Sequence, residues 1–184
     1  MQRVTNETLQ RIDRLRRKVA SYPGSLGPCL PEQEIAAFEA IYRIQLPEDF
    51  RLFLLNIGNG GSGPPTYGLN SLAQSVRREP DGPGETSNTS SLCPELPFPL
   101  TEAWVWEDED LEDEDTRLNA VYNHGHLFLG TDGCAMDWIL IVAGAERGKI
   151  WNRADVGAQP CAPSRDFASW YEYWLDGGQD WYGS

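Results

Sequence analysis

The sequence predicts an α+β fold, a single domain over residues 1–184 in which a central antiparallel β-sheet carries N-terminal helices and a C-terminal helix packed on it. Two patterns support this prediction. Near both ends of the chain, apolar residues recur at three- and four-residue intervals, which is the spacing of amphipathic helices. Between residues 121 and 152, short apolar runs rich in Ile and Val are typical of strands. Helices on either side of antiparallel strands make an α+β domain.

The first helix is predicted from about Thr5 to Ala20, with Thr5 or Asn6 as its cap. Its apolar stripe consists of Leu9, Ile12, Leu15 and Val19. The opposite side is basic and carries Arg11, Arg14, Arg16, Arg17 and Lys18. These bases could bind an acidic partner. We favour a solvated face, because cations also suit the carboxyl end of a helix.

Two further helices are predicted to begin with a proline followed by acids, a pattern that suits the amino end of a helix. One begins at Pro31, and its apolar face consists of Ile35, Phe38, Ile41 and Tyr42. The other begins at Pro47, and its apolar face consists of Phe50, Phe53, Leu54 and Ile57. Because only residues 44–46 separate them, the two helices should be neighbours.

A glycine-rich turn follows the third predicted helix. Gly58 can take the left-handed cap, and Asn59, Gly60 and Gly61 tolerate positive φ, so the backbone is expected to turn sharply. A phosphate cradle is the alternative. Such loops normally precede a helix, whereas this one follows it.

The middle of the chain is predicted to be a short strand at residues 67–72 and then a long Pro-rich and acidic surface excursion at about 74–118. The excursion contains the acidic tract, eight acids in nine residues: Glu107, Asp108, Glu109, Asp110, Glu112, Asp113, Glu114 and Asp115. Because like charges this dense resist burial, we expect a solvated loop or an exposed helix end. Trp104 and Trp106 should anchor the excursion to the fold.

The strand region is predicted to begin with one or two short strands at residues 121–129, around a turn at 123–125. Residues 136–143 predict a central strand covered on both faces. A tight turn at 146–148 then predicts a hairpin to residues 149–152, so these two strands should pair antiparallel.

The last helix is predicted to be capped by Ser164 and ended by Gly177 and Gly178. Its stripe consists of Phe167, Trp170, Tyr171, Trp174 and Leu175. Because burial of side chains this large contributes on the order of 2 kcal/mol each, this helix should belong to the core.

Composition limits the classes of partner. With 28 acids and 15 bases the net charge is −13, which disfavours a nucleic-acid or anionic-membrane surface and favours basic partners. The four cysteines are far apart, as expected of free thiols. No signal-peptide pattern opens the chain, and the longest apolar run, 138–145, is too short to span a membrane, so we expect a cytoplasmic protein.

Residues that could carry catalysis are few. His124 and His126 could bind a metal from one side of a strand, but no further ligands cluster with them, and two surface histidines are the favoured interpretation. Asp132 and Gly133 are typical of a turn in which the aspartate bonds its own backbone. No nucleophile elbow, P-loop or dinucleotide motif is present. We therefore predict a protein that is not an enzyme and holds no metal and no cofactor.

Two blocks of sequence resemble the SUKH superfamily of cell-wall assembly regulators and bacterial immunity proteins. The first lies within residues 35–61 and the second within residues 127–175. The residues that carry the family's structural motif are Leu46, Pro47, Asp49, Phe53, Asn59, Gly60, Gly61, Asp132, Gly133, Trp138 and Trp170. The resemblance implies an α+β fold and a role in binding another protein.

The expected function is that of a protein-binding module whose acidic tract contacts a basic partner. The resemblance implies an immunity protein that neutralises a cognate bacterial toxin, frequently a nuclease, by direct binding. The alternative is a non-catalytic regulatory scaffold like the fungal family members. A toxin gene directly beside this one would favour the first interpretation.

Overall fold

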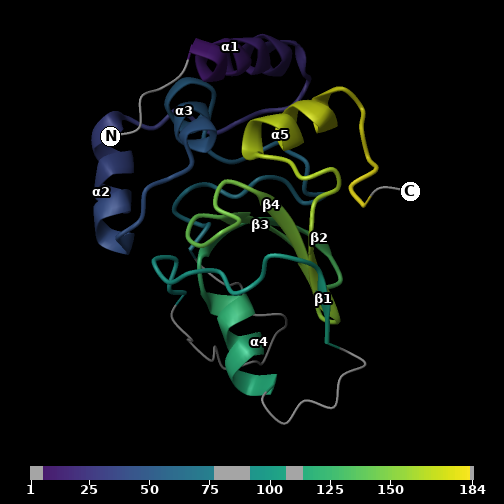
Figure 1. Cartoon of the computed structure of the whole chain (residues 1–184). Helices are drawn as coiled ribbons and strands as arrows, with labels where there is room; N and C mark the ends of the chain where they lie inside the picture. The colour runs from purple at the N-terminus through teal and green to yellow at the C-terminus, as the bar shows by residue number, and fades with distance from the viewer. Residues whose placement is uncertain (1–5, 77–91, 107–113, 183–184) are drawn as a thin grey trace, which may run out of the picture.

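The computed structural model describes residues 6–76, 92–106 and 114–182, the side chains of Glu114 and Asp115 excepted (Figure 1). The helices are α1 Asn6–Ser21, α2 Glu32–Tyr42, α3 Glu48–Asn56, α4 Glu114–Asn123 and α5 Phe167–Leu175. The strands are β1 Trp104–Val105, β2 His126–Gly133, β3 Met136–Ile141, β4 Ile150–Ala154 and β5 Gly157–Pro160. They form one antiparallel sheet in the order β1-β5-β4-β3-β2, which confirms the predicted α+β fold.

The helices lie in layers on the two faces of the sheet. Figure 1 shows α3 and α5 over one face, α1 outermost above them, and α4 on the opposite face. The α1 helix therefore packs on α3 and α5, whereas the sequence predicted that it would pack on the sheet. Its buried residues are Ile12 and Leu15.

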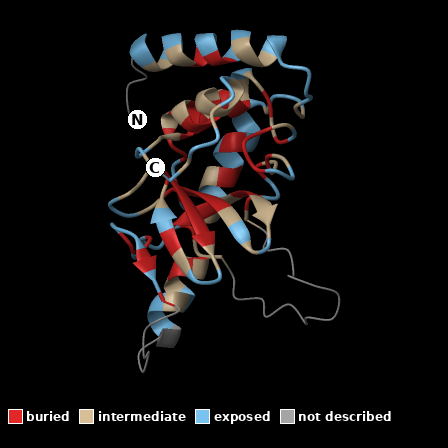
Figure 2. Ribbon diagram, turned by 90° about the vertical axis from the view of Figure 1, so that its right-hand side faces the viewer, coloured by how far each residue is buried: buried red, intermediate tan, exposed pale blue. Residues whose placement is uncertain are grey.

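The core follows the alternation of the strands. In β3, Trp138 and Leu140 belong to the core beneath α3 and α5, whereas Ile139 and Ile141 belong to the core that α4 covers. All four side chains are fully buried, so β3 is covered on both faces as predicted (Figure 2). It pairs with β4 from Asp137↔Arg153 to Leu140↔Ile150, although the connecting loop is longer than the predicted tight turn.

The strand predictions for residues 67–72 and 121–123 were wrong. Residues 114–123 form helix α4 because Val121 turns inward and is fully buried. The segment 67–72 is no strand, since Leu69 makes only an isolated bridge to Gly61. Two short strands, β5 and β1, were not predicted.

Several helix ends also differ from prediction. Asp166, and not Ser164, caps α5, because its carboxylate accepts a hydrogen bond from the Ser169 backbone. Gly58 does not adopt positive φ, whereas Gly60 and Gly61 do, at 76° and 110°. Ile41 is 71% exposed although it was predicted on the buried face of α2.

Part of the predicted surface excursion belongs to the core. Phe98 and Leu100 are almost fully buried in the core that α4 covers. A side chain at Gly125 would lie 2.2 Å from the Phe98 backbone nitrogen, so only glycine fits where this segment crosses the sheet. Among the described residues, no helix has both the length and the apolar character needed to cross a bilayer.

Candidate interaction surface

Most of the acidic tract lies outside the described residues. This applies to Glu107, Asp108, Glu109, Asp110, Glu112 and Asp113. Glu114 and Asp115 are the first two residues of α4, where a helix dipole favours negative charge. The structure does describe the residues directly before the tract and helix α4, in which the tract ends.

The tract begins directly after Trp106, which is held at the edge of the sheet. The Trp106 backbone N–H donates to Val156 O at 2.9 Å, and its indole N–H donates to Asp155 O. Trp104 and Trp106 are each only 6% exposed, and their ring centroids lie 5.1 Å apart. The predicted tryptophan anchor is therefore confirmed.

The tract ends on α4, which packs against the same tryptophans. The Tyr122 ring lies 6.1 Å from the Trp106 ring, and the Tyr122 hydroxyl donates to Ala154 O at 3.4 Å. The Arg117 guanidinium lies 4.0 Å above the Trp104 ring, a cation–π contact. Both ends of the tract are thus attached to one aromatic cluster of two buried tryptophans and a half-buried tyrosine, which we call the tryptophan anchor: Trp104, Trp106 and Tyr122.

A buried arginine fixes the carboxyl end of α4. Arg153, only 4% exposed, donates to the Tyr122 carbonyl at 3.3 Å and to Asp137 at 2.8 Å. A cation at this end of a helix suits the negative end of the dipole. Its Nη1 also contacts His126 Nε2 at 3.3 Å. Sequence reasoning missed Arg153, because no local pattern distinguishes it from an exposed arginine of an edge strand.

His126 belongs to this network and not to the surface, so the prediction of two surface histidines was wrong for His126. It is 1% exposed, and its Nδ1 lies 2.8 Å from His124 O. Nδ1 donates in that bond, which leaves Nε2 to accept from Arg153. Burial and the adjacent Arg153 lower the pKa of His126 to about 3, so the imidazole is neutral at physiological pH.

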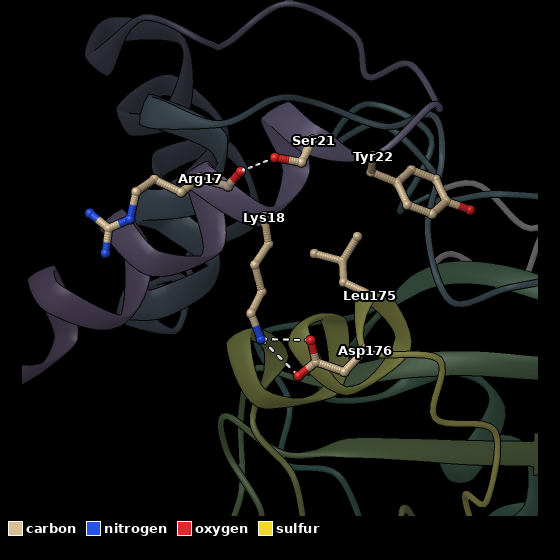
Figure 3. A pocket seen from close by; sticks show the side chains of 6 residues that line it. All are labelled: Arg17, Lys18, Ser21, Tyr22, Leu175 and Asp176. Carbon is tan, nitrogen blue, oxygen red and sulfur yellow. Dashed lines mark hydrogen bonds and ion pairs between the residues drawn. The ribbon is translucent and has the colours of Figure 1, made fainter.

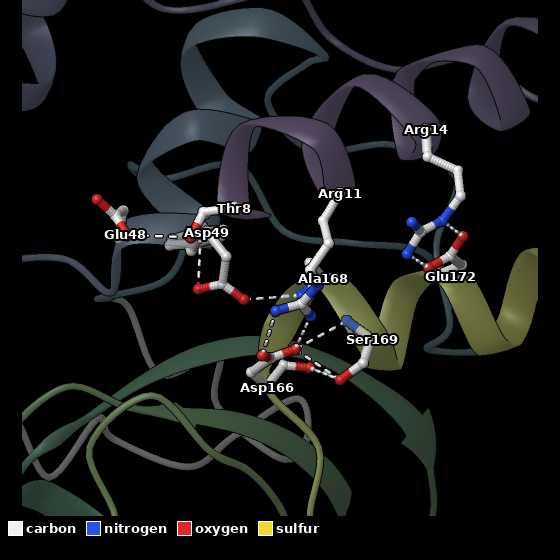
Figure 4. Close-up of polar contacts among 10 residues, drawn as sticks. Thr8, Arg11, Arg14, Glu48, Asp49, Asp166, Ala168, Ser169 and Glu172 are labelled. Atoms are coloured by element: carbon white, nitrogen blue, oxygen red, sulfur yellow. Dashed lines mark hydrogen bonds and ion pairs between the residues drawn. The ribbon is translucent and has the colours of Figure 1, made fainter. Parts of the chain in front are cut away.

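A second charged surface lies between α1 and α5 (Figure 4). The Arg11 guanidinium forms two hydrogen bonds to Asp166, at 3.0 and 2.7 Å. Arg14 binds Glu172 in the same two-pronged way, at 2.6 and 2.9 Å. Hydrogen bonds from Arg14 and Lys18 lower the pKa of Glu172 to about 2.

Three of the five bases on α1 are therefore paired with acids of α5 and not free in solvent, as they were interpreted from the sequence, although the Arg14 side chain is still 48% exposed. Lys18 bonds to both carboxylate oxygens of Asp176, at 2.7 Å each, and completes a row of three bases paired with α5. Arg16 and Arg17 remain exposed. We call the acids of this row, Asp166, Glu172 and Asp176, the α5 acidic row.

In the family motif, Asp49 joins two helices. It is 7% exposed in α3, and its carboxylate accepts from the Phe50 N–H at 2.9 Å and from the Ala168 N–H of α5 at 2.8 Å. Burial raises the pKa of Asp49 to about 6, against these hydrogen bonds. Phe53, fully buried, packs 5.0 Å from the Phe167 ring, while Leu46 and Pro47 are buried at the start of α3.

The glycine turn of the motif holds together three segments of chain. The Asn59 side chain accepts from the Leu72 N–H at 2.7 Å, and Gly61 exchanges backbone bonds with Leu69. A side chain at Gly61 would lie 2.4 Å from Ser25 O, and one at Gly60 would lie 2.7 Å from a backbone nitrogen. The glycines are therefore needed for close backbone contact.

Asp132 forms hydrogen bonds to residues outside its own turn. The prediction that it bonds its own backbone was wrong. Its carboxylate accepts from the Trp138 indole at 2.7 Å and from the Thr66 N–H at 2.7 Å. The local bond is made instead by Thr131, whose hydroxyl accepts from the Gly133 N–H at 3.0 Å. Asp132 thereby orients Trp138, whose ring packs 5.5 Å from the fully buried Trp170.

Two open hollows lie beside α1. One, of about 390 Å³, is lined by Arg17, Lys18, Ser21, Tyr22, Leu175 and Asp176 (Figure 3). The other, of about 250 Å³, lies where Arg11 and Asp166 meet the start of α3. In the described part of the chain, no three or more His, Cys, Asp or Glu side chains gather as metal ligands would. The four cysteines form no disulfide, as predicted.

Comparison with known proteins gave one family. The model of the SMI1 / KNR4 family (SUKH-1) matches residues 29–176, which include α2 through α5 and the whole sheet. No curated protein and no solved structure gave a significant match. The matched range covers most of the chain and contains all the motif residues described above, so the chain belongs to the SMI1 / KNR4 family (SUKH-1).

Proposed function

We propose that this protein is a cytoplasmic immunity protein, which neutralises a basic toxin domain by binding directly over its surface. The acidic tract would be the contact surface, and the partner would be a protein, not a nucleic acid or a membrane. Family membership is compatible with this role.

The observation that carries the proposal is the attachment of both ends of the acidic tract to the tryptophan anchor. Trp106 lies directly before the tract and Tyr122 lies on the helix that ends it, with their rings 6.1 Å apart. A segment fastened at both ends has less conformational entropy to lose on binding than a free tail. The tract carries eight of the 28 acids of a chain with net charge −13, so it would steer a basic partner electrostatically.

Two described groups that could perform chemistry, His126 and Cys161, are in unsuitable states, which supports a non-catalytic role. His126 is buried and neutral, with a pKa of about 3, and burial raises the pKa of the Cys161 thiol to about 11. Neither group exchanges a proton readily near neutral pH. Members of the family are generally non-catalytic. We therefore propose that the protein acts by binding alone.

A regulatory scaffold that binds a partner without inhibiting it is the second candidate. The observation in its favour is the family itself, since the matching description is that of SMI1 / KNR4 proteins. The two candidates differ in their consequence for the partner. An immunity protein abolishes the toxicity of the neighbouring gene product on co-expression, whereas a scaffold leaves the activity of its partner intact.

The contact surface can be tested with two variants of equal charge. The tract variant is Asp108→Asn, Glu109→Gln and Asp110→Asn. The control removes three exposed acids from α1 and α2, by Glu7→Gln, Asp13→Asn and Glu34→Gln. We expect slower association of the tract variant with the captured basic partner and a flatter dependence on salt, while the control stays close to the parent protein.

Association rates measured at low and at high salt test whether the acidic tract is the contact surface. Melting temperatures of the variants check that they fold. Equal rates for the two variants would show that only net charge matters. Association of the parent protein that does not change with salt would exclude electrostatic steering altogether.

A further inference from the structure

We propose that the face of α3 and α5 beneath α1 is a docking surface for a basic amphipathic helix of a partner protein, and that α1 occupies this surface until the partner displaces it. The surface is separate from the acidic tract. In Figure 1, α1 lies at one end of the molecule and α4, which ends the tract, lies at the other. The inference therefore does not depend on the function proposed for the tract.

The charges of the surface define what binds to it. The α5 acidic row meets Arg11, Arg14 and Lys18, which lie three and then four residues apart and so face the same side of a helix. Ile12 and Leu15 follow the two arginines and are 3% and 1% exposed. A partner helix with two bases, two aliphatic residues and a third base at these spacings would reproduce every one of these contacts.

The cover that α1 provides combines a small buried apolar contact with charges accessible to solvent. Only Ile12 and Leu15 of α1 are buried, and Leu9 of the same stripe is 44% exposed. The side chains of Arg14 and Lys18 are 48% and 32% exposed in their ion pairs. Exposed pairs of this kind are individually weak and are screened by salt. Of the three helices in this stack, α1 buries the fewest residues, two against four each in α3 and α5.

The α1 contact is also open at its ends. The hollow of about 390 Å³ lies between the last turn of α1 and Leu175 (Figure 3). The hollow of about 250 Å³ lies beside Thr8 and Arg11. A helix that belonged to the closed core would leave less space between its ends and its neighbours. The contact between α1 and α5 is thus bordered by a hollow near each end of α1, while the Lys18–Asp176 ion pair extends it into the last turn.

The chain is attached again directly after α1, so release of α1 would leave the rest of the fold in place. Ser62 N–H donates to Ser25 O at 2.8 Å, and Gly27 N–H donates to Gly60 O at 2.9 Å. The family model begins at residue 29, after α1, and includes α3 and α5. The docking surface therefore belongs to the common fold, whereas its cover lies outside the matched range.

The test uses a labelled synthetic peptide of residues 6–21 and the full-length protein. In the variant Arg11→Glu/Arg14→Glu, the new acids face Asp166 and Glu172, so like charges expel α1. We expect the peptide to bind this variant at least about tenfold more tightly than the parent protein, where the tethered α1 competes at a high effective concentration. Binding should weaken as salt increases.

The control variant Arg16→Glu/Arg17→Glu makes the same change of charge on the solvent side of α1. It should bind the peptide as weakly as the parent protein. Equal binding to all three proteins would overturn the proposal. Loss of cooperative unfolding in the Arg11→Glu/Arg14→Glu variant would also overturn it, because α1 would then be essential to the core.

Hydrogen exchange of the unmodified protein provides an independent test. If α1 opens by itself, its amides should exchange at least about tenfold faster than those of α5, and faster still at high salt. Exchange of the two helices at the same rate would contradict the proposal. The protein could also form a dimer in which two copies exchange α1 and which the peptide dissociates. That result would show that a second copy of this chain occupies the surface, and it would overturn the proposal of a different partner protein.

Discussion

The buried carboxylate of Asp49 should make the stability of this protein fall as pH rises through 6, a dependence that Asp49→Asn should abolish. Asp49 is 7% exposed, and it accepts two backbone hydrogen bonds that connect α3 with the first turn of α5. Burial raises its pKa from 3.8 to about 6 because the charged form is poorly solvated. The folded protein therefore binds a proton at Asp49 more tightly than the unfolded chain does.

The sign and the size of the effect follow from this difference. A group whose pKa is raised on folding contributes stability that is complete below its unfolded value of 3.8 and is lost as pH rises through about 6. A shift of about two pKa units corresponds to about 3 kcal/mol. Relative to Asp49→Asn, the parent protein should lose about this much free energy of unfolding between about pH 4 and pH 7.

Urea unfolding followed by tryptophan fluorescence, at several pH values in this range, measures the difference. Subtraction of one protein from the other removes the titration of shared groups, including His126 on the opposite side of the sheet. The amide introduced by Asp49→Asn does not titrate, so any constant offset from its altered hydrogen bonds does not affect the slope. A difference that stays flat, or that rises with pH, would refute the buried-carboxylate reasoning.

Three further predictions concern stability. Glu172→Gln should show a pH dependence of stability opposite to that of Asp49→Asn, since the pKa of Glu172 is lowered to about 2. The parent protein should be more stable than this variant, and the difference in unfolding free energy should shrink as pH falls below 4.5. A difference that does not change with pH would contradict the ion pairs. Trp170→Ala should lower the free energy of unfolding by about 3–5 kcal/mol because the side chain is fully buried, whereas an unchanged urea midpoint would place it outside the core. Gly60→Ala should lower the free energy of unfolding more than Gly148→Ala in the same assay. Both residues have positive φ, but only at Gly60 would the added carbon lie close to a backbone nitrogen, at 2.7 Å. Equal losses of unfolding free energy in the two variants would count against close packing at Gly60.

The sequence predicted those elements whose signals are local. Helices α1, α2, α3 and α5 were recognised because apolar spacing, prolines and acids lie within each segment. The antiparallel β3–β4 pair was recognised because β3 is largely apolar and β4 follows it closely in the chain, although the connecting loop is longer than predicted. The last turn of α4, residues 121–123, was mistaken for a strand because Val and Tyr favour strands. Only the burial of Val121 and the packing of Tyr122 against Trp106 favour a helix there.

Net charge, the acidic tract and the family motif can be read from the sequence because counts and spacings do not depend on how the chain folds. Which charges meet depends entirely on the path of the chain. Arg11 pairs with Asp166 at a separation of 155 residues, and Asp49 bonds to Ala168 at a separation of 119. No local pattern signals such pairs, so only the tertiary structure could show that three bases of α1 pair with acids of α5 and that His126 is buried.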